Sequence, residues 1–363
     1  MHEKVSTRQT GIMLFFVIFS TKLLTLPSLF YQRAQDKALF AVILGLLIDF
    51  LSLIFVYKFI VNNKGKSLYE VLKNKLTGIV AKIIYVCIFL FFFIKIVFII
   101  NGGFVYVRDS VFTQSDLFLF FIVFASICNL LSYNTNKALG RTCEFFFPLI
   151  FVLILLCIFL GFQSDLLTIP KFDIFKPWGQ ILSSNLNLLV FFGDPLFLLL
   201  MCDRIEFDNK FKKNIFKYSG FAYISIFLIY FLFYGIYGET SIMHEFVLGD
   251  IIAFTFNVTD LGRLDIIPVV AILFIFYIQG SIFFKCCFKS VKEILGKEYK
   301  NWVYAIFNIV LVITIFYLLN SIEKTLYFTQ SFFKWITLFL CIILPIVLLF
   351  FKTKKEKNLW LKN

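Results

Sequence analysis

Runs of about 20 apolar residues recur along this chain from one end to the other, and lysine-rich polar segments separate them. Each run is long enough to cross a hydrocarbon core about 30 Å thick as a helix. Lipid offers the backbone no hydrogen-bond partners, so a segment in this solvent satisfies its own polar groups by forming a helix. The pattern therefore predicts an all-α membrane protein.

We predict about ten transmembrane helices in a single integral membrane domain that covers residues 1–363. Residues 1–8 form a short tail, residues 9–351 the transmembrane bundle and residues 352–363 a basic tail. The predicted segments are Gln9–Tyr31, Ala38–Ile60, Ile79–Tyr106, Leu117–Leu131, Glu144–Phe162, Gln180–Asp203, Phe216–Tyr237, Ile266–Phe288, Trp302–Leu319 and Trp335–Phe351.

Lysine and arginine residues are distributed unevenly between the two sides of this arrangement. Most of the 35 lie in the two tails and in the loops after segments two, four, six and eight. The loop of residues 58–82 alone holds six lysines. Because short loops rich in lysine and arginine stay in the cytoplasm, we expect both termini on the cytoplasmic side.

Two loops on the opposite side are longer than simple turns. The loop Gln163–Gly179 contains Pro170 and Pro177, which exclude one continuous helix. The loop Glu239–Asp265 predicts an amphipathic helix across the outer face, which either rests in the membrane interface or gates a cavity. Its apolar residues at helical spacing are Val247, Ile251, Phe254 and Val258.

Segments one and six each contain a helix-breaking feature near mid-depth. In segment one, Pro27 follows soon after Lys22. In segment six, Gly193 and Pro195 flank Asp194. Proline removes a backbone donor and clashes with the preceding turn, and glycine is conformationally free. These are the first and the sixth of ten segments, so they occupy matching positions in two halves of five.

This placement predicts a 5+5 inverted repeat of the LeuT-like type, with helices one and six broken. The N–H and C=O groups freed at each break would face a central cavity and bind a substrate or an ion there. The alternative is a pair of ordinary proline kinks, because membrane helices tolerate proline.

Four ionisable residues fall at mid-depth, namely Lys22, Asp49, Lys95 and Asp194. Each would cost about 2.5–3.5 kcal/mol if it faced lipid, which favours pairing in the interior. Lys22 and Asp194 are the expected pair because both lie at breaks, and they either bind a ligand or only neutralise each other. The predicted ligand-binding residues are Thr21, Lys22, Leu24, Thr25, Lys95, Phe191, Phe192, Gly193, Asp194, Tyr277 and Gln279.

The remaining chemistry of the sequence excludes several classes of protein. The net charge of +13 comes from alternate loops, as membrane topology requires, so we expect no nucleic-acid partner. The eight cysteines form no CxxC motif and the two histidines are far apart, so we expect no metal site. No nucleophile–base motif or phosphate-binding loop is present, so we expect neither a cofactor nor an enzyme.

Five short motifs occur in an order that resembles one family, the B subunit of spore germinant receptors. These GerAB-type spore germination permeases belong to the amino acid–polyamine–organocation superfamily. Asp194 stands where that family usually has glutamate, and the glycine usual near the first break is missing. The motifs are Leu24-Thr-Leu-Pro-Ser28, Gly65-Lys-Ser-Leu-Tyr-Glu70, Gly140-Arg-Thr-Cys-Glu-Phe-Phe-Phe-Pro148, Phe191-Phe-Gly-Asp194 and Gly262-Arg-Leu-Asp265.

The resemblance implies a subunit of the inner spore membrane that assembles with a larger A subunit and a lipoprotein C subunit. It also implies a nutrient ligand, often an amino acid. We therefore expect a sensor that binds a small nutrient at mid-membrane and signals to its partner subunits. An amino-acid permease with alternating access and a scaffold without a ligand remain the alternatives.

Overall fold

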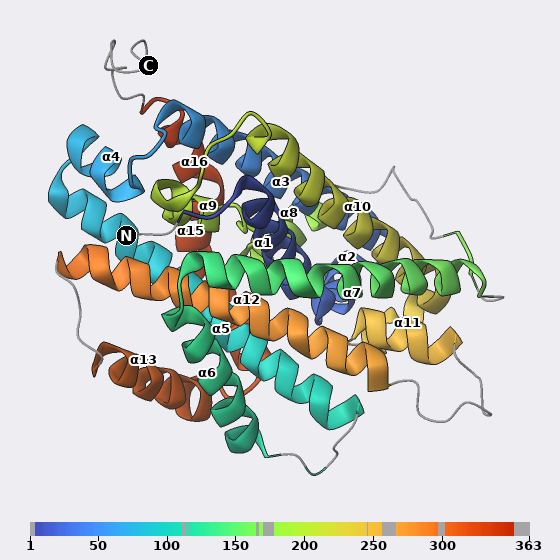
Figure 1. Cartoon of the computed structure of the whole chain (residues 1–363). Coiled ribbons are helices and arrows are strands. Elements are labelled where there is room, and N and C mark those ends of the chain that lie inside the picture. The colour runs from blue at the N-terminus through green and yellow to red at the C-terminus, as the bar shows by residue number, and fades with distance from the viewer. Residues whose placement is uncertain are drawn as a thin grey trace.

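The computed structural model describes residues 4–110, 114, 116–164, 167–169, 178–244, 246–255, 266–296 and 302–351. Within these residues the chain is helical apart from turns and one bridge between Val5 and Ile205. The helices, shown in Figure 1, are α1 (Thr7–Ser20), α2 (Leu26–Ala34), α3 (Ala38–Asn62), α4 (Leu68–Lys75), α5 (Gly78–Ser110), α6 (Leu117–Tyr133), α7 (Asn136–Phe162), α8 (Gly179–Asn187), α9 (Leu196–Met201), α10 (Phe211–Tyr237), α11 (Val247–Thr255), α12 (Ile266–Leu295), α13 (Trp302–Ile313), α14 (Ile322–Gln330), α15 (Phe333–Leu338) and α16 (Leu344–Leu348).

The prediction of an all-α membrane protein is confirmed. Five helical stretches are long and apolar enough to cross a membrane: Leu26–Asn62, Gly78–Ser110, Asn136–Gln163, Phe211–Met243 and Val269–Leu295. Two shorter apolar helices occupy segments four and ten, and segments one and six are interrupted helices. Each of the ten predicted segments therefore corresponds to a helix or to a broken helix.

Several predicted boundaries differ from the structure; α12, for example, runs on from the predicted Phe288 to Leu295, and two further differences have a clear local cause. Helix α7 begins at Asn136, before the predicted Glu144, because the Thr135 hydroxyl accepts a hydrogen bond from the Ala138 amide and caps it. Segment nine ends in a bend of 98°, after which α14 follows. The sequence analysis missed α14, which starts where the Ser321 side chain accepts a hydrogen bond from the Lys324 amide.

Helix α1 lies in the interior of the bundle (Figure 1). All of its residues except Arg8 are buried, and it packs mainly against α10 and α7. Helices α5 and α12 form the most extensive helix pair. By contrast, α7 leaves large apolar side chains such as Phe145 and Val152 exposed, as lipid-facing positions require. Polar residues in the middle of α5, such as Lys95 and Asn101, are buried inside the bundle.

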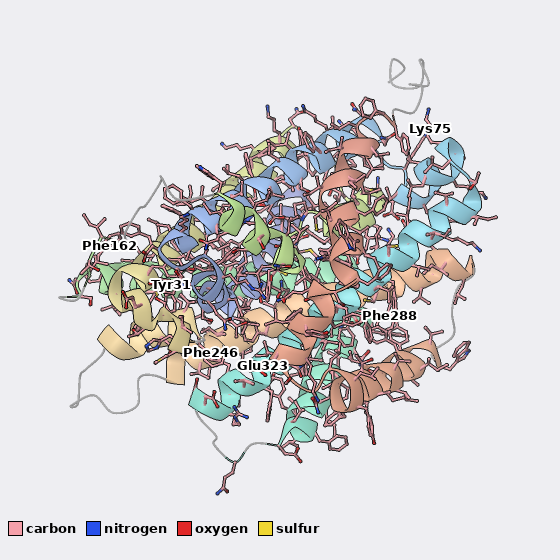
Figure 2. All side chains as sticks on the ribbon, turned by 180° about the vertical axis from the view of Figure 1, so that it is seen from behind. Tyr31, Lys75, Phe162, Phe246, Phe288 and Glu323 are labelled. Carbon is pink, nitrogen blue, oxygen red and sulfur yellow. The ribbon has the colours of Figure 1, made fainter. Side chains whose placement is uncertain are left out.

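The two ends of the bundle differ in charge. Figure 2 shows Lys75 at one end and Tyr31 and Phe162 at the other. The lysine-rich end carries α4 and the ends of α9 and α12. After α9, Cys202 Sγ donates to the Lys66 carbonyl at 3.1 Å before α4, and Asp203 contacts Lys289 of α12. The opposite end carries α11, so the predicted amphipathic helix is present with Ile251 buried. Pro170, Pro177, Val258, the side chain of Phe254, the motif Gly262–Asp265 and the tail of residues 352–363 lie outside the described structure.

Candidate functional site

The break in segment one is an unwound turn between two helices. Helix α1 ends at Ser20, a 3-10 turn covers Thr21–Leu23, and Leu24 leaves the helical conformation. Helix α2 then begins with Pro27 in its first turn, where a backbone N–H is unneeded. Gly102 of α5 makes room for the break, because a Cβ there would lie 2.8 Å from Leu24 Cδ1. Proline thus restarts the helix here and does not merely kink it.

The break in segment six is sharper and centres on Gly193. Helix α8 is followed by a 3-10 turn that ends at Phe191, and Phe192 is extended. Gly193 has a φ of +79°, a left-handed conformation that favours glycine. A Cβ on Gly193 would also collide with Cys341 Sγ. Helix α9 restarts directly after Pro195, so this short sequence dictates the break and its sharpness.

The two breaks meet at a cluster of four charged side chains, which we call the central cluster: Lys22, Asp49, Lys95 and Asp194. Lys22 Nζ contacts Asp194 Oδ2 and lies 3.3 Å from Asp49 Oδ2. Lys95 Nζ lies 2.6 Å from Asp194 Oδ1. All four side chains are at most 1% exposed. The predicted contact between Lys22 and Asp194 is therefore present, within a cluster of two ammonium and two carboxylate groups.

Asp49 holds the central cluster to the break in segment six. The Gly193 amide, which the break frees from helical hydrogen bonding, donates to Asp49 Oδ1 at 2.8 Å. The Tyr223 hydroxyl donates to Asp49 Oδ2 at 3.3 Å. The sequence analysis placed Asp49 at mid-depth but not among the ligand-binding residues. The sequence feature that could have identified Asp49 as a site residue is a carboxylate in the middle of a strongly apolar helix.

Polar side chains from α10 and α12 donate hydrogen bonds to backbone carbonyl groups at the break in segment one. The Tyr230 hydroxyl donates to the Lys22 carbonyl, and the Tyr234 hydroxyl donates to the Pro27 carbonyl at 2.8 Å. Gln279 Nε2 donates to the Val17 carbonyl at 2.8 Å. The sequence analysis missed both tyrosines, although their spacing of four residues puts them on one helix face.

Aromatic rings enclose the ammonium groups of the central cluster. Lys22 Nζ lies 5.1 Å from the centre of the Phe192 ring, and Lys95 Nζ lies 4.8 Å from the Phe91 ring. Such cation–π contacts partly replace lost hydration. The Phe191 ring, in contrast, packs against Phe98 at 5.0 Å. Of the two predicted phenylalanines, Phe192 therefore contacts the charges.

Several polar atoms at this site have no hydrogen-bond partner among the described residues. They are Ser20 Oγ, Thr21 Oγ1 and Gln279 Oε1, all of them buried. Buried polar atoms are nearly always paired, so an unpaired set at a helix break is available to a small ligand. Thr25 contributes its backbone instead, because its carbonyl accepts from Ser28 Oγ at 2.8 Å.

The structure does not bring Tyr277 to the central cluster. Its ring packs against Phe124 of α6 at 5.5 Å, and it is only partly buried. Tyr277 and Gln279 stand two positions apart on α12, so their side chains leave the helix in roughly opposite directions. The expectation that both line one cavity was therefore wrong for Tyr277.

The lysine-rich end is closed around segments one and six. The Val5 amide donates to the Arg204 carbonyl at 2.9 Å, and Thr7 Oγ1 donates to Asp208 at 3.0 Å. At the opposite end, a cavity of about 290 Å³ is lined by Tyr31, Asp36, Tyr234 and Glu239, among others. Tyr234 also donates to the Pro27 carbonyl, so one side chain connects this cavity with the break in segment one.

A sequence profile of the spore germination protein family matches residues 4–321. The chain belongs to this family. The match covers nearly the whole described bundle, including both breaks and all four residues of the central cluster. A search among curated proteins found no match. The resemblance proposed from five short motifs is thus confirmed, and the chain is a membrane permease-like member of the spore germination permeases.

Solved structures similar to this spore germination permease are transporters. A manganese transporter of Eremococcus coleocola in complex with an aromatic bis-isothiourea substituted compound aligns with a TM-score of 0.57 at 12% identity, covering 96% of this chain and 81% of that one. One mutant of the same transporter aligns with a TM-score of 0.59 at 12% identity, covering 96% of this chain and 82% of that one. A second mutant aligns with a TM-score of 0.60 at 13% identity, covering 96% of this chain and 81% of that one. At this identity the likeness shows the LeuT-like fold alone. In the described part of the chain, no group of three His, Cys, Asp or Glu side chains could hold a metal ion.

Proposed function

We propose that this protein is the ligand-sensing membrane subunit of a spore nutrient receptor. A small nutrient, most simply an amino acid, binds at mid-membrane between the breaks of segments one and six. The observation that supports this assignment is the contact of Lys22 with Asp194 across the two breaks. In proteins of this fold, discontinuous helices meet at the substrate site.

The charge of the central cluster favours a zwitterionic ligand. Two ammonium and two carboxylate groups carry no net charge, so a lone metal ion or anion would introduce an uncompensated charge into low dielectric. An α-amino acid brings one ammonium and one carboxylate. Its carboxylate replaces Asp194 as the partner of Lys22, and its ammonium replaces Lys22 as the partner of Asp194. The unpaired Thr21 hydroxyl supplies a further contact.

The route to this site leads from the end opposite to the lysine-rich one. The cavity at Tyr31 and Tyr234 lies on that side, and Tyr234 bonds the Pro27 carbonyl within the break. A ligand that displaces this hydrogen bond would loosen the second half of segment one. To act as a signal, the ligand must bind the resulting conformation more tightly than the closed one.

The central test is the nutrient response of spores that carry Asp194→Asn. If Asp194 holds the ligand ammonium, the concentration of nutrient for half-maximal germination rises by more than any fall in membrane abundance of the variant explains. Membrane abundance, measured by immunoblot, separates loss of binding from loss of folding. An unchanged dose–response in an abundant variant would remove the ligand from this site.

The fold also supports a second candidate function, an amino-acid permease with alternating access, because the similar solved structures are transporters. Uptake of radiolabelled amino acids into proteoliposomes distinguishes the two. Uptake above that of protein-free vesicles would favour the permease, whereas saturable binding without uptake would favour the sensor. If the protein shows neither binding nor uptake, a scaffold role remains.

The proposed partners are the A and C subunits of a germinant receptor, and the proposed location is the inner spore membrane with both termini in the cytoplasm. The family assignment supports the partners and the location. The concentration of lysine and arginine on α4 and at the ends of α9 and α12 supports the orientation. Copurification of A and C subunits with this chain from spore membranes tests the assembly.

A further inference from the structure

A second polar cavity lies at the lysine-rich end, away from the central cluster. Its volume is about 230 Å³, which is several times the share of about 30 Å³ that one water molecule takes in the liquid. It lies between the ends of α9 and α12, the start of α13 and the connection from α6 to α7. Figure 1 shows α13 at the edge of the bundle beside α6.

The cavity has an excess of positive charge. Four of its lining residues are cationic, namely Arg204, Lys285, Lys289 and Lys292. Two carboxylates lie near them: Asp203, which contacts Lys289 and lies 3.8 Å from Arg204 Nε, and Glu293. Among the described residues, the four cations that line the cavity outnumber these two carboxylates, which favours an anion at this site.

The cations of this cavity are held in place by the surrounding structure. Lys285 Nζ donates to the Asn134 carbonyl at 2.5 Å, which directs its ammonium toward the connection between α6 and α7. Arg204 lies close enough to Lys285 for the two charges to repel each other. An anion between them would turn this repulsion into two favourable contacts.

A buried amide adds a polar contact of a different kind. The Asn136 side chain lines the cavity and is 3% exposed, and its Oδ1 has no hydrogen-bond partner among the described residues. This oxygen can accept a hydrogen bond from a hydroxyl group of a ligand. The cavity thus combines fixed cations with a buried amide group.

The rim of the cavity is apolar and faces the lipid. Tyr133 both lines the cavity and is 68% exposed. Leu130 on α6 and Trp302 on α13 are similarly exposed on the surface beside it. A ligand whose charged group sits among the cations can therefore lay an apolar chain along α6 and α13.

We propose that this cavity binds the phosphate headgroup of an anionic phospholipid from the leaflet at the lysine-rich end. Basic pockets between membrane helices recognise such headgroups through their phosphate charge. A soluble phosphate shares this chemistry but cannot use the apolar rim. An acidic protein segment would use the charge without needing either the small cavity or the lipid-facing surface.

The test measures lipid retention by the full-length chain purified in detergent. Native mass spectrometry after titration with phosphatidylglycerol gives a dissociation constant, and phosphatidylcholine gives the baseline. Arg204→Gln with Lys292→Gln should weaken phosphatidylglycerol binding about 30-fold, because each cation near a lipid surface contributes about 1 kcal/mol. Lys73→Gln with Lys75→Gln on α4 removes the same charge at the same end outside the cavity, and should change binding by less than about twofold.

Four other results would overturn the proposal. Equal weakening by both double variants would indicate a diffuse surface charge. Displacement of the lipid by inorganic phosphate, or saturable binding of a polyglutamate peptide that lipid does not displace, would assign the cavity to a soluble anion or to a protein. The charge-conserving pair Arg204→Lys with Lys292→Arg should retain lipid, and its failure to do so in a folded protein would exclude a charge-based site.

Discussion

Asp49 Oδ1 accepts a hydrogen bond of 2.8 Å from the Gly193 amide. A carboxylate of α3 therefore pairs with a backbone group that the break in segment six leaves without a helical partner. The same carboxylate reaches Lys22 through its other oxygen at 3.3 Å. Asp49 therefore ties both breaks to α3. A movement of Lys22 out of the central cluster would act on the same carboxylate that bonds the Gly193 amide.

Charge compensation in the central cluster gives the first prediction. Lys22→Met removes one cation and leaves two carboxylates with one ammonium in a buried site, so it should destabilise the protein by about 3–5 kcal/mol and lower its membrane abundance. Lys22→Met combined with Asp194→Asn restores neutrality and should recover most of that abundance.

Quantitative immunoblots of purified membranes measure both variants of the cluster. Lys64→Met, at an exposed position of the lysine-rich end, is the matched control and should keep wild-type abundance. If the double variant were no more abundant than Lys22→Met alone, the cluster would not be held together by charge balance.

The conformation of Gly193 gives the second prediction. Gly193→Ala places a Cβ against Cys341 Sγ at a left-handed φ, so it should cost about 1–3 kcal/mol in strain and also displace the π-helical turn Phe339–Ile343 between α15 and α16. Gly220→Ala on α10 meets no atom within 4 Å and should leave the protein unchanged. Thermal unfolding in detergent compares the two. A Gly193→Ala protein as stable as Gly220→Ala would contradict the described break.

Acidic pH gives the third prediction, through α11. Burial raises the pKa of Asp250 above its ordinary value of 3.8, while the Phe246 amide and His244 nearby oppose this effect. A carboxyl group with a raised folded-state pKa favours folding when protonated, so its contribution is fully present below about 3.8 and is lost as pH rises through the folded value. Protection of α11 should therefore decrease over this range as pH increases.

Hydrogen exchange of the α11 amides in wild type and Asp250→Asn, compared at each pH, isolates this effect. The asparagine side chain cannot ionise, so the difference between the two proteins should grow from acid to neutral pH. Asp116→Asn, at an exposed helix cap, is the control. A constant difference across the range would show that Asp250 does not titrate in the folded protein.

Topology gives the fourth prediction. In a cysteine-depleted background, Met243→Cys should react with an impermeant maleimide added to intact cells, because residue 243 is 83% exposed at the end opposite to the lysine-rich one, which the proposed orientation places outside. Lys75→Cys is also exposed but lies at the lysine-rich end, so it should react only after permeabilisation (Figure 2). The reverse pattern of labelling would invert the proposed orientation.

The sequence was most informative where the physical signal is local. Long apolar runs located the ten segments, and Pro27 and the run from Gly193 to Pro195 located the breaks because proline and glycine act on their own backbone. Lys22 and Asp194 stood out because a charge in a membrane segment needs a partner. Asp194 could be predicted as the partner of Lys22 only because both residues lie at helix breaks.

Long-range contacts were not predictable in the same way. Nothing local connects Asp49 with Gly193, or Tyr230 with the Lys22 carbonyl, because each contact depends on how α3 and α10 pack against the broken helices. The direction of Tyr277 depended on the rotation of α12 about its axis, which an all-round apolar helix does not reveal. Helix α14 carries too little apolar surface to be recognised as a membrane element.

The neutrality of the central cluster has an electrical consequence. Moving one elementary charge through a membrane potential of 100 mV changes its energy by about 2.3 kcal/mol. Two ammonium and two carboxylate groups that shift together, with or without a zwitterion, carry no net gating charge. A conformational change built on Lys22, Asp49, Lys95 and Asp194 would therefore be insensitive to voltage, and the protein could respond equally in a polarised and in a depolarised membrane.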